Sequence, residues 1–143
     1  GDGPEKLKLE KYVSDNNLSK LVDFKGEIFG NSRIRYFQRS DIFCAPYTDE
    51  AFGITVLEAL SCGVPVVGFK NEAFNEVLKG YPYPKLFVPN KNILKLAAAL
   101  MELIKNNKKR AEIGAWGIDR VKSFNWVNTA KQTEELYNQI LKI

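Results

Sequence analysis

IFCAPYTDEAFGITVLEALSCGVPVVG, residues 42–68, contains the pattern strand, helix, strand. Its first four residues are apolar and end at Pro46, which predicts a buried strand because no polar residue alternates through them. Good helix formers without proline then fill residues 53–62, and the polar and acidic residues 48–50 precede them, as is typical of a helix start. The run at residues 64–68 is β-branched and bounded by glycine, so it predicts the next buried strand.

A connection of this length favours parallel pairing of the two strands through a right-handed crossover. The sequence therefore predicts an α/β fold in which helices flank a parallel sheet. Strands are expected at Val22–Lys25, Ile42–Ala45, Val64–Val67 and Leu86–Val88. Helices are expected at Glu5–Asn16, Ser32–Gln38, Gly53–Cys62, Asn71–Lys79, from Asn92, at Lys108–Lys122 and at Asn128–Leu141.

Glu58 is the one charged residue within residues 53–62. Thr55 and Cys62 lie on the same helix face, so a narrow polar stripe runs along an otherwise apolar helix. This stripe is either a solvated face or part of a ligand site. A glycine at a helix start, here Gly53, lets a ligand approach backbone N–H groups at the positive end of the helix dipole. Glu50 and Glu58 could then contact two separated parts of one extended polar ligand, such as a nucleotide sugar.

Composition restricts the class of protein and of chemistry. With 143 residues, 45% of them hydrophobic and 27% charged, the chain can form one globular domain with its own core. Cys44 and Cys62 have apolar neighbours and are expected to be buried free thiols in a reducing compartment. Two cysteines without any histidine do not make a zinc site, so we expect no metal site and no histidine acid–base chemistry.

The net charge of +4 suits an anionic ligand or an acidic membrane surface. The basic clusters lack interleaved aromatic residues, so no nucleic-acid partner is expected. The densest basic stretch, Lys105–Arg110, is expected to be a solvated junction between two helices rather than a membrane patch. Arg33, Arg35 and Arg39 are expected to face solvent.

Three motifs together resemble a known family. They are Glu50-x-Phe52-Gly53 followed by Leu57-Glu58, the GVPVV run at residues 63–67, and Gly1-Asp2-Gly3-Pro4 at the start. This order resembles the C-terminal, donor-binding domain of GT-B glycosyltransferases of the GT4 type, most closely the phosphatidylinositol mannosyltransferase branch. The resemblance implies a Rossmann-like domain and a retaining, metal-independent transfer without a cofactor. The donor would be a UDP-, GDP- or ADP-sugar, and the acceptor a glycan or a lipid.

The resemblance also implies roles for individual residues. Glu50 is expected to be catalytic and to contact the transferring sugar, and Glu58 is expected to bind the ribose hydroxyls of the nucleotide. The donor sugar and its diphosphate are expected to lie against Gly1, Asp2, Gly3, Phe52, Gly53, Ile54 and Thr55. The nucleotide base is expected beside Gly26, Glu27 and Ile28, a loop that equally fits an ordinary strand-to-helix connection.

The chain departs from the family in two places. Ala51 stands where the family usually has glycine, and the basic pair that binds the donor diphosphate lies upstream of Gly1 in the family. The first two strands of the sheet also precede Gly1 in the family, so the chain is expected to lack the centre of its sheet and to be part of a larger protein. The alternatives are that another chain supplies these strands or that the remaining strands pair in a different order.

Residues 1–143 are therefore expected to be the donor-binding domain of a two-domain enzyme, whose N-terminal domain binds the acceptor. This enzyme would serve polysaccharide or glycolipid biosynthesis in the cytoplasm, or as a peripheral protein at the cytoplasmic face of a membrane. Two alternatives remain, since a fold alone does not fix function. One is a GT-B relative of other chemistry, such as a sugar-nucleotide epimerase or a glycogen or sucrose synthase. The other is a non-catalytic module that binds nucleotide sugars.

Overall fold

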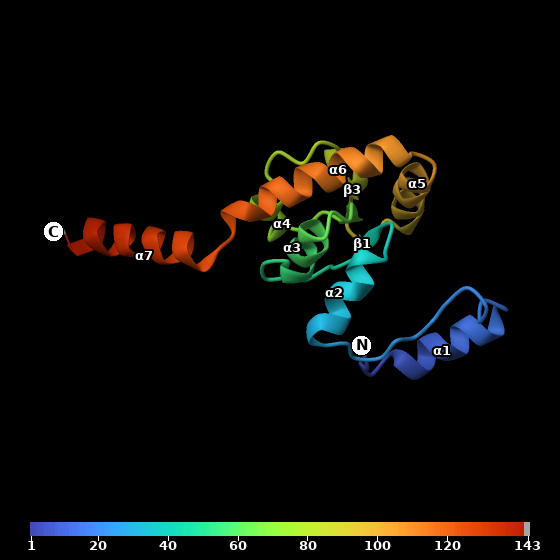
Figure 1. Ribbon diagram of the computed structural model, residues 1–143. Helices are drawn as coiled ribbons and strands as arrows, with labels where there is room; N and C mark the ends of the chain where they lie inside the picture. Colours follow the sequence, from blue (N-terminus) through green and yellow to red (C-terminus); the bar gives the residue numbers. More distant parts are fainter. Residues whose placement is uncertain (142–143) are drawn as a thin grey trace. The chain divides into compact units, whose positions relative to one another are not determined.

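The structure is a computed structural model and describes residues 1–141. The chain divides into two compact units, and the boundary falls between Tyr36 and Phe37. The first unit contains α1 (Lys6–Asp15), and α2 (Gly30–Gln38) crosses the boundary. The second contains β1 (Phe43–Ala45), α3 (Ile54–Ser61), β2 (Val66–Phe69), α4 (Phe74–Val77), η1 (Pro84–Leu86), β3 (Phe87–Val88), α5 (Ile93–Ile104), α6 (Asn107–Arg120), η2 (Val121–Ser123) and α7 (Trp126–Leu141) (Figure 1).

The sheet of the second unit is parallel, with the strand order β1-β2-β3. Gly68 pairs with Ala45 on one side and with Phe87 on the other. A Cβ atom on Gly68 would lie 2.2 Å from the Ala45 carbonyl oxygen, so the close approach of β1 and β2 requires glycine there. β2 begins at Val66 rather than at the expected Val64, because the intervening proline has no N–H to donate to the ladder.

The core of the second unit lies between the sheet and its helices. α3 and α5 contact the sheet, and α6 packs against both helices (Figure 1). The largest fully buried side chains include Leu60, Leu86, Leu103 and Ile113, which come from α3, η1, α5 and α6. A Cβ atom on Gly114 would lie 2.4 Å from the carbonyl oxygen of Gly63, which follows α3, so α6 approaches the end of α3 through backbone contact.

Glycines in the left-handed conformation mark both ends of α3. Gly53, at the N-cap, has φ +94°, and Gly63, just after the helix, has φ +72°. The N–H of Val64 donates to the carbonyl oxygen of Ala59 at 3.0 Å, which is the long bond of a Schellman motif. The helix predicted for residues 53–62 is confirmed.

Several sequence-based expectations need correction. Val22–Lys25 forms no strand, because a strand exists only where a neighbour supplies hydrogen bonds and none of the described residues does so here. α2 begins at Gly30, two residues before the expected start at Ser32. α4 is shorter than expected because the Asn71 side chain accepts the Ala73 N–H at 2.9 Å, which favours a turn before the helix.

Both cysteines are free thiols, but they are half-buried rather than buried. Burial raises the pKa of the Cys44 thiol, which keeps it protonated near neutral pH.

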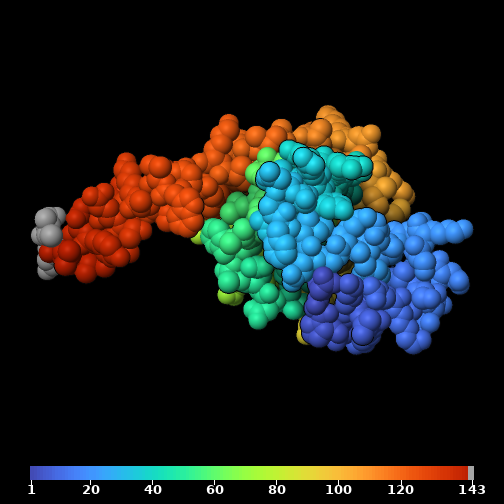
Figure 2. All heavy atoms as spheres, turned by 60° about the horizontal axis from the view of Figure 1, so that its bottom comes forward, coloured from blue at the N-terminus to red at the C-terminus, as the bar shows by residue number. Residues whose placement is uncertain are grey.

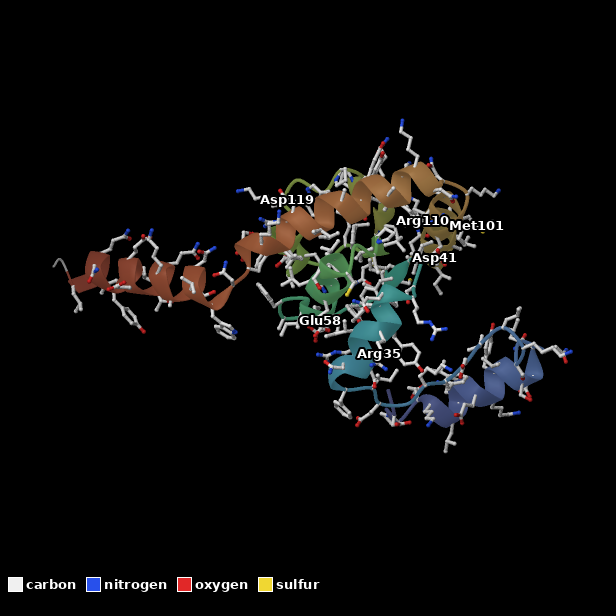
Figure 3. The ribbon with its side chains drawn as sticks, in the orientation of Figure 1. Arg35, Asp41, Glu58, Met101, Arg110 and Asp119 are labelled. Carbon is white, nitrogen blue, oxygen red and sulfur yellow. The ribbon has the colours of Figure 1, made fainter. Side chains whose placement is uncertain are left out.

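The basic junction between α5 and α6 is confirmed, and Arg110 has a defined role in it (Figure 3). Its guanidinium donates to the carbonyl oxygens of Leu103 at 2.7 Å and Ile104 at 3.0 Å. These carbonyls lie at the C-terminal end of α5, where a cation is favoured by the helix dipole. Beyond this junction, the side chains of α7 lie at the surface, as its red atoms show in Figure 2.

Candidate functional site

One polar pocket lies at the carboxyl ends of the parallel strands. β1 ends at Ala45, β2 at Phe69 and β3 at Val88, and the segments that follow these strands line the pocket. Its volume is about 500 Å³. Its lining residues are Thr48, Asp49, Glu50, Ala51, Lys70, Asn71, Glu72, Ala73 and Asn90. Ligands of open α/β sheets bind outside this edge, so the polar pocket is the candidate site.

The carboxylate of Glu50 binds the backbone of its own loop, residues 50–53, which we call the Glu50 loop. Its Oε1 atom accepts the N–H groups of Ala51 at 3.0 Å, Phe52 at 3.2 Å and Gly53 at 3.2 Å. Successive backbone N–H groups that converge in this way form an anion-binding nest. The sequence predicts a Gly53 N–H that is open to a ligand, whereas in the structure this N–H is bonded to Glu50.

The first turn of α3 begins directly after the Glu50 loop. Its first main-chain bonds are donated by Val56 and Leu57 to the Gly53 carbonyl oxygen, at 3.0 and 3.1 Å. The N–H groups of Ile54 and Thr55 precede this ladder, as the first N–H groups of any helix do. They lie at the positive end of the helix dipole, where an anion such as a diphosphate is favoured.

Gly53 is fixed by space as well as by conformation. A Cβ atom there would lie 2.8 Å from Cε1 of Phe74, which is buried at the start of α4. Any other residue would also be strained at φ +94°. The glycine of the Glu50 loop therefore allows the loop to lie directly on the Phe74 ring.

Thr55 and Glu58, two further predicted site residues on α3, differ from each other in their surroundings. The Thr55 hydroxyl lies 3.1 Å from the Tyr47 hydroxyl, so it is held by a partner in the preceding loop. Glu58, labelled on α3 in Figure 3, is half-buried, and its Oε2 atom is buried. Part of a ligand site is therefore a better interpretation of the polar stripe than a fully solvated helix face.

The predicted site residues of the first unit form a cluster of their own. The Gly1 nitrogen donates to the Gly26 carbonyl oxygen at 2.7 Å, and Asp2 Oδ2 accepts the Glu27 N–H at 3.0 Å. Asp2 also pairs with Lys6, and the hydrogen bond from this ammonium lowers the pKa of the Asp2 carboxyl. Two segments that the sequence treats separately, residues 1–3 and 26–28, therefore lie together.

Sequence reasoning missed the other polar groups of the pocket. Lys70, Asn71 and Glu72 follow β2, and Asn90 follows β3. The available signal is their position directly after two predicted strands, because residues at that edge of a parallel sheet face its ligands. Lys70 is exposed and lines the pocket.

A second hollow adjoins the polar pocket and has a volume of about 420 Å³. It shares Lys70, Asn71 and Glu72 with the polar pocket. Its other lining residues are Phe74, Asn75, Leu78, Tyr81, Pro84 and Phe87.

Within residues 1–141, no group of three or more His, Cys, Asp or Glu side chains could hold a metal ion. None of the helices in that range has the length and apolar character needed to cross a membrane.

Comparison with known proteins supplies the family context. Residues 1–120 match the protein family described as "Glycosyl transferases group 1". A phosphatidyl-myo-inositol mannosyltransferase from Mycobacterium leprae is 31% identical over 124 residues, which cover 86% of this chain and 33% of that protein. A D-inositol 3-phosphate glycosyltransferase from Corynebacterium urealyticum is 29% identical over 145 residues, which cover 98% of this chain and 33% of that protein. The chain thus spans about a third of the length of these curated relatives.

Solved structures show the same fold. Sucrose-phosphate synthase from Thermosynechococcus elongatus matches with a TM-score of 0.83 and 28% identity, over 99% of this chain and 36% of that chain. The pneumococcal O-GlcNAc transferase GtfA, in complex with UDP and GlcNAc, matches with a TM-score of 0.76 and 18% identity, over 97% of this chain and 28% of that chain. The expected α/β fold of the GT-B type and the resemblance to phosphatidylinositol mannosyltransferases are confirmed.

Proposed function

Because this chain belongs to the glycosyl transferases group 1 family, we propose that it is the donor-binding domain of a glycosyltransferase and binds a sugar nucleotide in the polar pocket. One observation carries this proposal. Three N–H groups of the Glu50 loop converge on the Glu50 carboxylate directly before the first turn of α3. Glu50 and Ala51 of this loop line the polar pocket at the carboxyl edge of the sheet. The Glu50 carboxylate suits the hydroxyl groups of a sugar, and the N–H groups at the start of α3 suit a diphosphate.

Each part of the donor has a counterpart among these residues. When a sugar enters, Glu50 exchanges its bonds to the loop N–H groups for bonds to sugar hydroxyls, and the N–H groups of Phe52 and Gly53 become donors to the ligand. The N–H groups of Ile54 and Thr55 face the diphosphate, and the helix dipole adds to the attraction. Such preorganised donors stabilise the negative charge that develops on the leaving diphosphate during transfer.

The nucleotide is assigned to Glu58 and to the first unit. The half-buried carboxylate of Glu58 accepts hydrogen bonds from the ribose hydroxyls. The Gly1–Gly3 and Gly26–Ile28 segments are proposed to contact the donor diphosphate and the base, respectively. In each case the support is the family resemblance. Residues 1–3 are exposed, whereas Gly26 and Ile28 are half-buried.

The finer chemistry is proposed from the relatives. Transfer is retaining and metal-independent, as in GT4 enzymes, and the mannosyltransferase relatives favour a GDP-mannose donor and a phosphatidylinositol acceptor. A soluble phosphorylated acceptor is the second candidate, because other relatives are named D-inositol 3-phosphate glycosyltransferase and sucrose-phosphate synthase. An acceptor-binding domain of the same enzyme completes the site, and the net charge of +4 suits work at the cytoplasmic face of an acidic membrane.

Two substitutions in the full-length protein test the different roles proposed for Glu50 and Glu58. Glu50→Gln should lower kcat by about 100-fold with little change in donor KM, because a displaced sugar reaches the transition state poorly.

Glu58→Ala should weaken GDP binding about ten- to a hundredfold, because hydrogen bonds to a charged group contribute about 1.5–3 kcal/mol. Steady-state kinetics with GDP-mannose and calorimetric titration of GDP and UDP measure these effects.

Glu134→Gln is the matched control, since Glu134 lies on the exposed surface of α7. It should leave both kcat and nucleotide binding unchanged. A Glu50→Gln enzyme with wild-type turnover would contradict the proposed role of Glu50, and a Glu58→Ala protein with wild-type nucleotide affinity would contradict that of Glu58.

A further inference from the structure

Arg120, the last residue of α6, binds the end of α4. Its Nε atom donates to the Val77 carbonyl oxygen at 3.1 Å, and its Nη2 atom donates to the Glu76 carbonyl oxygen. Both carbonyls lie in the last turn of the short helix α4. The guanidinium therefore stabilises the end of an element that is too short to be stable by its own hydrogen bonds.

The same guanidinium contacts an aromatic pair that reaches the Glu50 loop. Its Cζ atom lies 4.7 Å from the centroid of the Phe124 ring. The Phe124 ring packs edge to face against Phe52, with ring centroids 6.0 Å apart and an interplanar angle of 70°. Phe52 belongs to the Glu50 loop and has 38% of its surface exposed. Phe124 therefore covers part of the Phe52 ring.

These contacts connect the two segments that supply most of the lining of the polar pocket. The Glu50 loop follows β1, and it rests on Phe74 at Gly53 and on Phe124 at Phe52. Residues 70–73 follow β2 and lead directly into α4, whose end Arg120 binds. One guanidinium thus fixes α4 and, through Phe124, the position of Phe52.

We propose that Arg120 and Phe124 are positioning residues for Glu50: they fix the Glu50 loop and residues 70–73 at the separation that the donor sugar requires. This inference rests on the proposed function of the polar pocket. Neither side chain lines the polar pocket, and both act through Phe52 and α4. A planar guanidinium has five N–H donors in a fixed fork and a flat face, so it can bind two carbonyls and lie against a ring in one defined geometry.

The test measures amide hydrogen exchange together with kinetics in the full-length protein. The Ala51, Phe52 and Gly53 amides are bonded to Glu50, so their exchange rates report the geometry of the loop directly. In Arg120→Met and Phe124→Leu we expect exchange at residues 51–53 to be at least tenfold faster, with unchanged exchange at Val67 in β2. With GDP-mannose as donor, kcat should fall by about tenfold or more with little change in KM, as for lost transition-state positioning.

Two further variants separate positioning from general destabilisation. Phe124→Tyr keeps the ring and should restore both the exchange rates and kcat. Lys122→Met is the matched control, because Lys122 is exposed in the same short segment and its ammonium group pairs with Asp119 at the surface. It should behave as the wild type.

Unchanged exchange at residues 51–53 in both Arg120→Met and Phe124→Leu would overturn the proposal. Equal acceleration at Val67 would also overturn it, because the role would then be general stability. If Arg120→Met does not fold, Phe124→Leu alone decides, since Phe124 is only half-buried. A loop that loosens as expected, in an enzyme whose Glu50→Gln variant keeps full turnover, would sink the proposed function of Glu50 and leave the loop-fixing role of Arg120 intact.

Discussion

The two units of this chain are stabilised by different kinds of interaction. Every buried hydrophobic residue of the described chain lies between Ala45 and Ile113, within the second unit. In the first unit, large apolar side chains such as Leu7, Leu21 and Phe29 are 72–82% exposed. Polar contacts that involve Asp2 stabilise its loops instead. Packing against Phe74 and Phe124 therefore positions the Glu50 loop, whereas hydrogen bonds to residues 26 and 27 position the Gly1–Gly3 segment.

The largest expected effect in this comparison comes from adding one methyl group to the sheet. In Gly68→Ala the new Cβ would lie 2.2 Å from the Ala45 carbonyl oxygen, so β1 and β2 must separate. We expect a loss of about 3 kcal/mol or more in the free energy of unfolding of the full-length protein. Gly3→Ala in the first unit is the control, because nothing lies within 4 Å of its added Cβ. Urea denaturation that gave both variants the same stability would break the contrast between the units.

The presence or absence of a neighbouring strand explains which strands the sequence could predict in the two units. The apolar run at residues 42–45 and the alternating run at residues 22–25 both favour a strand. Only the first pairs, because residues 66–69 lie beside it with compatible backbone spacing at Gly68. A strand depends on its neighbour, and the pattern of one segment does not reveal whether that neighbour is present. The end of α3 and the start of α5 were easier to predict, because Gly63 and the Asn92 side chain act within the adjoining helical turn.

The candidate site was predictable where a motif marks it. Glu50, Gly53 and Glu58 stand at recognisable spacing, and the structure places Glu50 and Gly53 in one loop. No sequence motif identifies Arg120 or Phe124. Their contacts to Val77 and Phe52 join residues that are far apart in the sequence. The bond between the Glu50 carboxylate and its own loop was also not predictable, because it depends on the backbone conformation of residues 50–53.

A smaller effect concerns the pKa of Asp2 in the first unit. The hydrogen bond from Lys6, followed by that from the Glu27 N–H, lowers this pKa below the ordinary value. Because the folded-state pKa is lowered, the stabilisation by Asp2 is present above the ordinary aspartate pKa, about 3.9, and is lost as the pH falls through the lowered value. NMR titration of the Asp2 carboxyl carbon measures it directly. Lys6→Met should move the pKa back toward the ordinary value, and an identical pKa in both proteins would remove Lys6 as the main cause.

The most direct test of the central claim is a crystal structure of the full-length protein with intact GDP-mannose. We expect the hexose in the polar pocket with hydroxyl groups bonded to Glu50, and the diphosphate within one helical turn, about 5 Å, of the N–H groups of Phe52, Gly53 and Ile54. A diphosphate bound farther than that from these groups, or a hexose outside the polar pocket, would contradict the assignment of this edge of the sheet as the donor site.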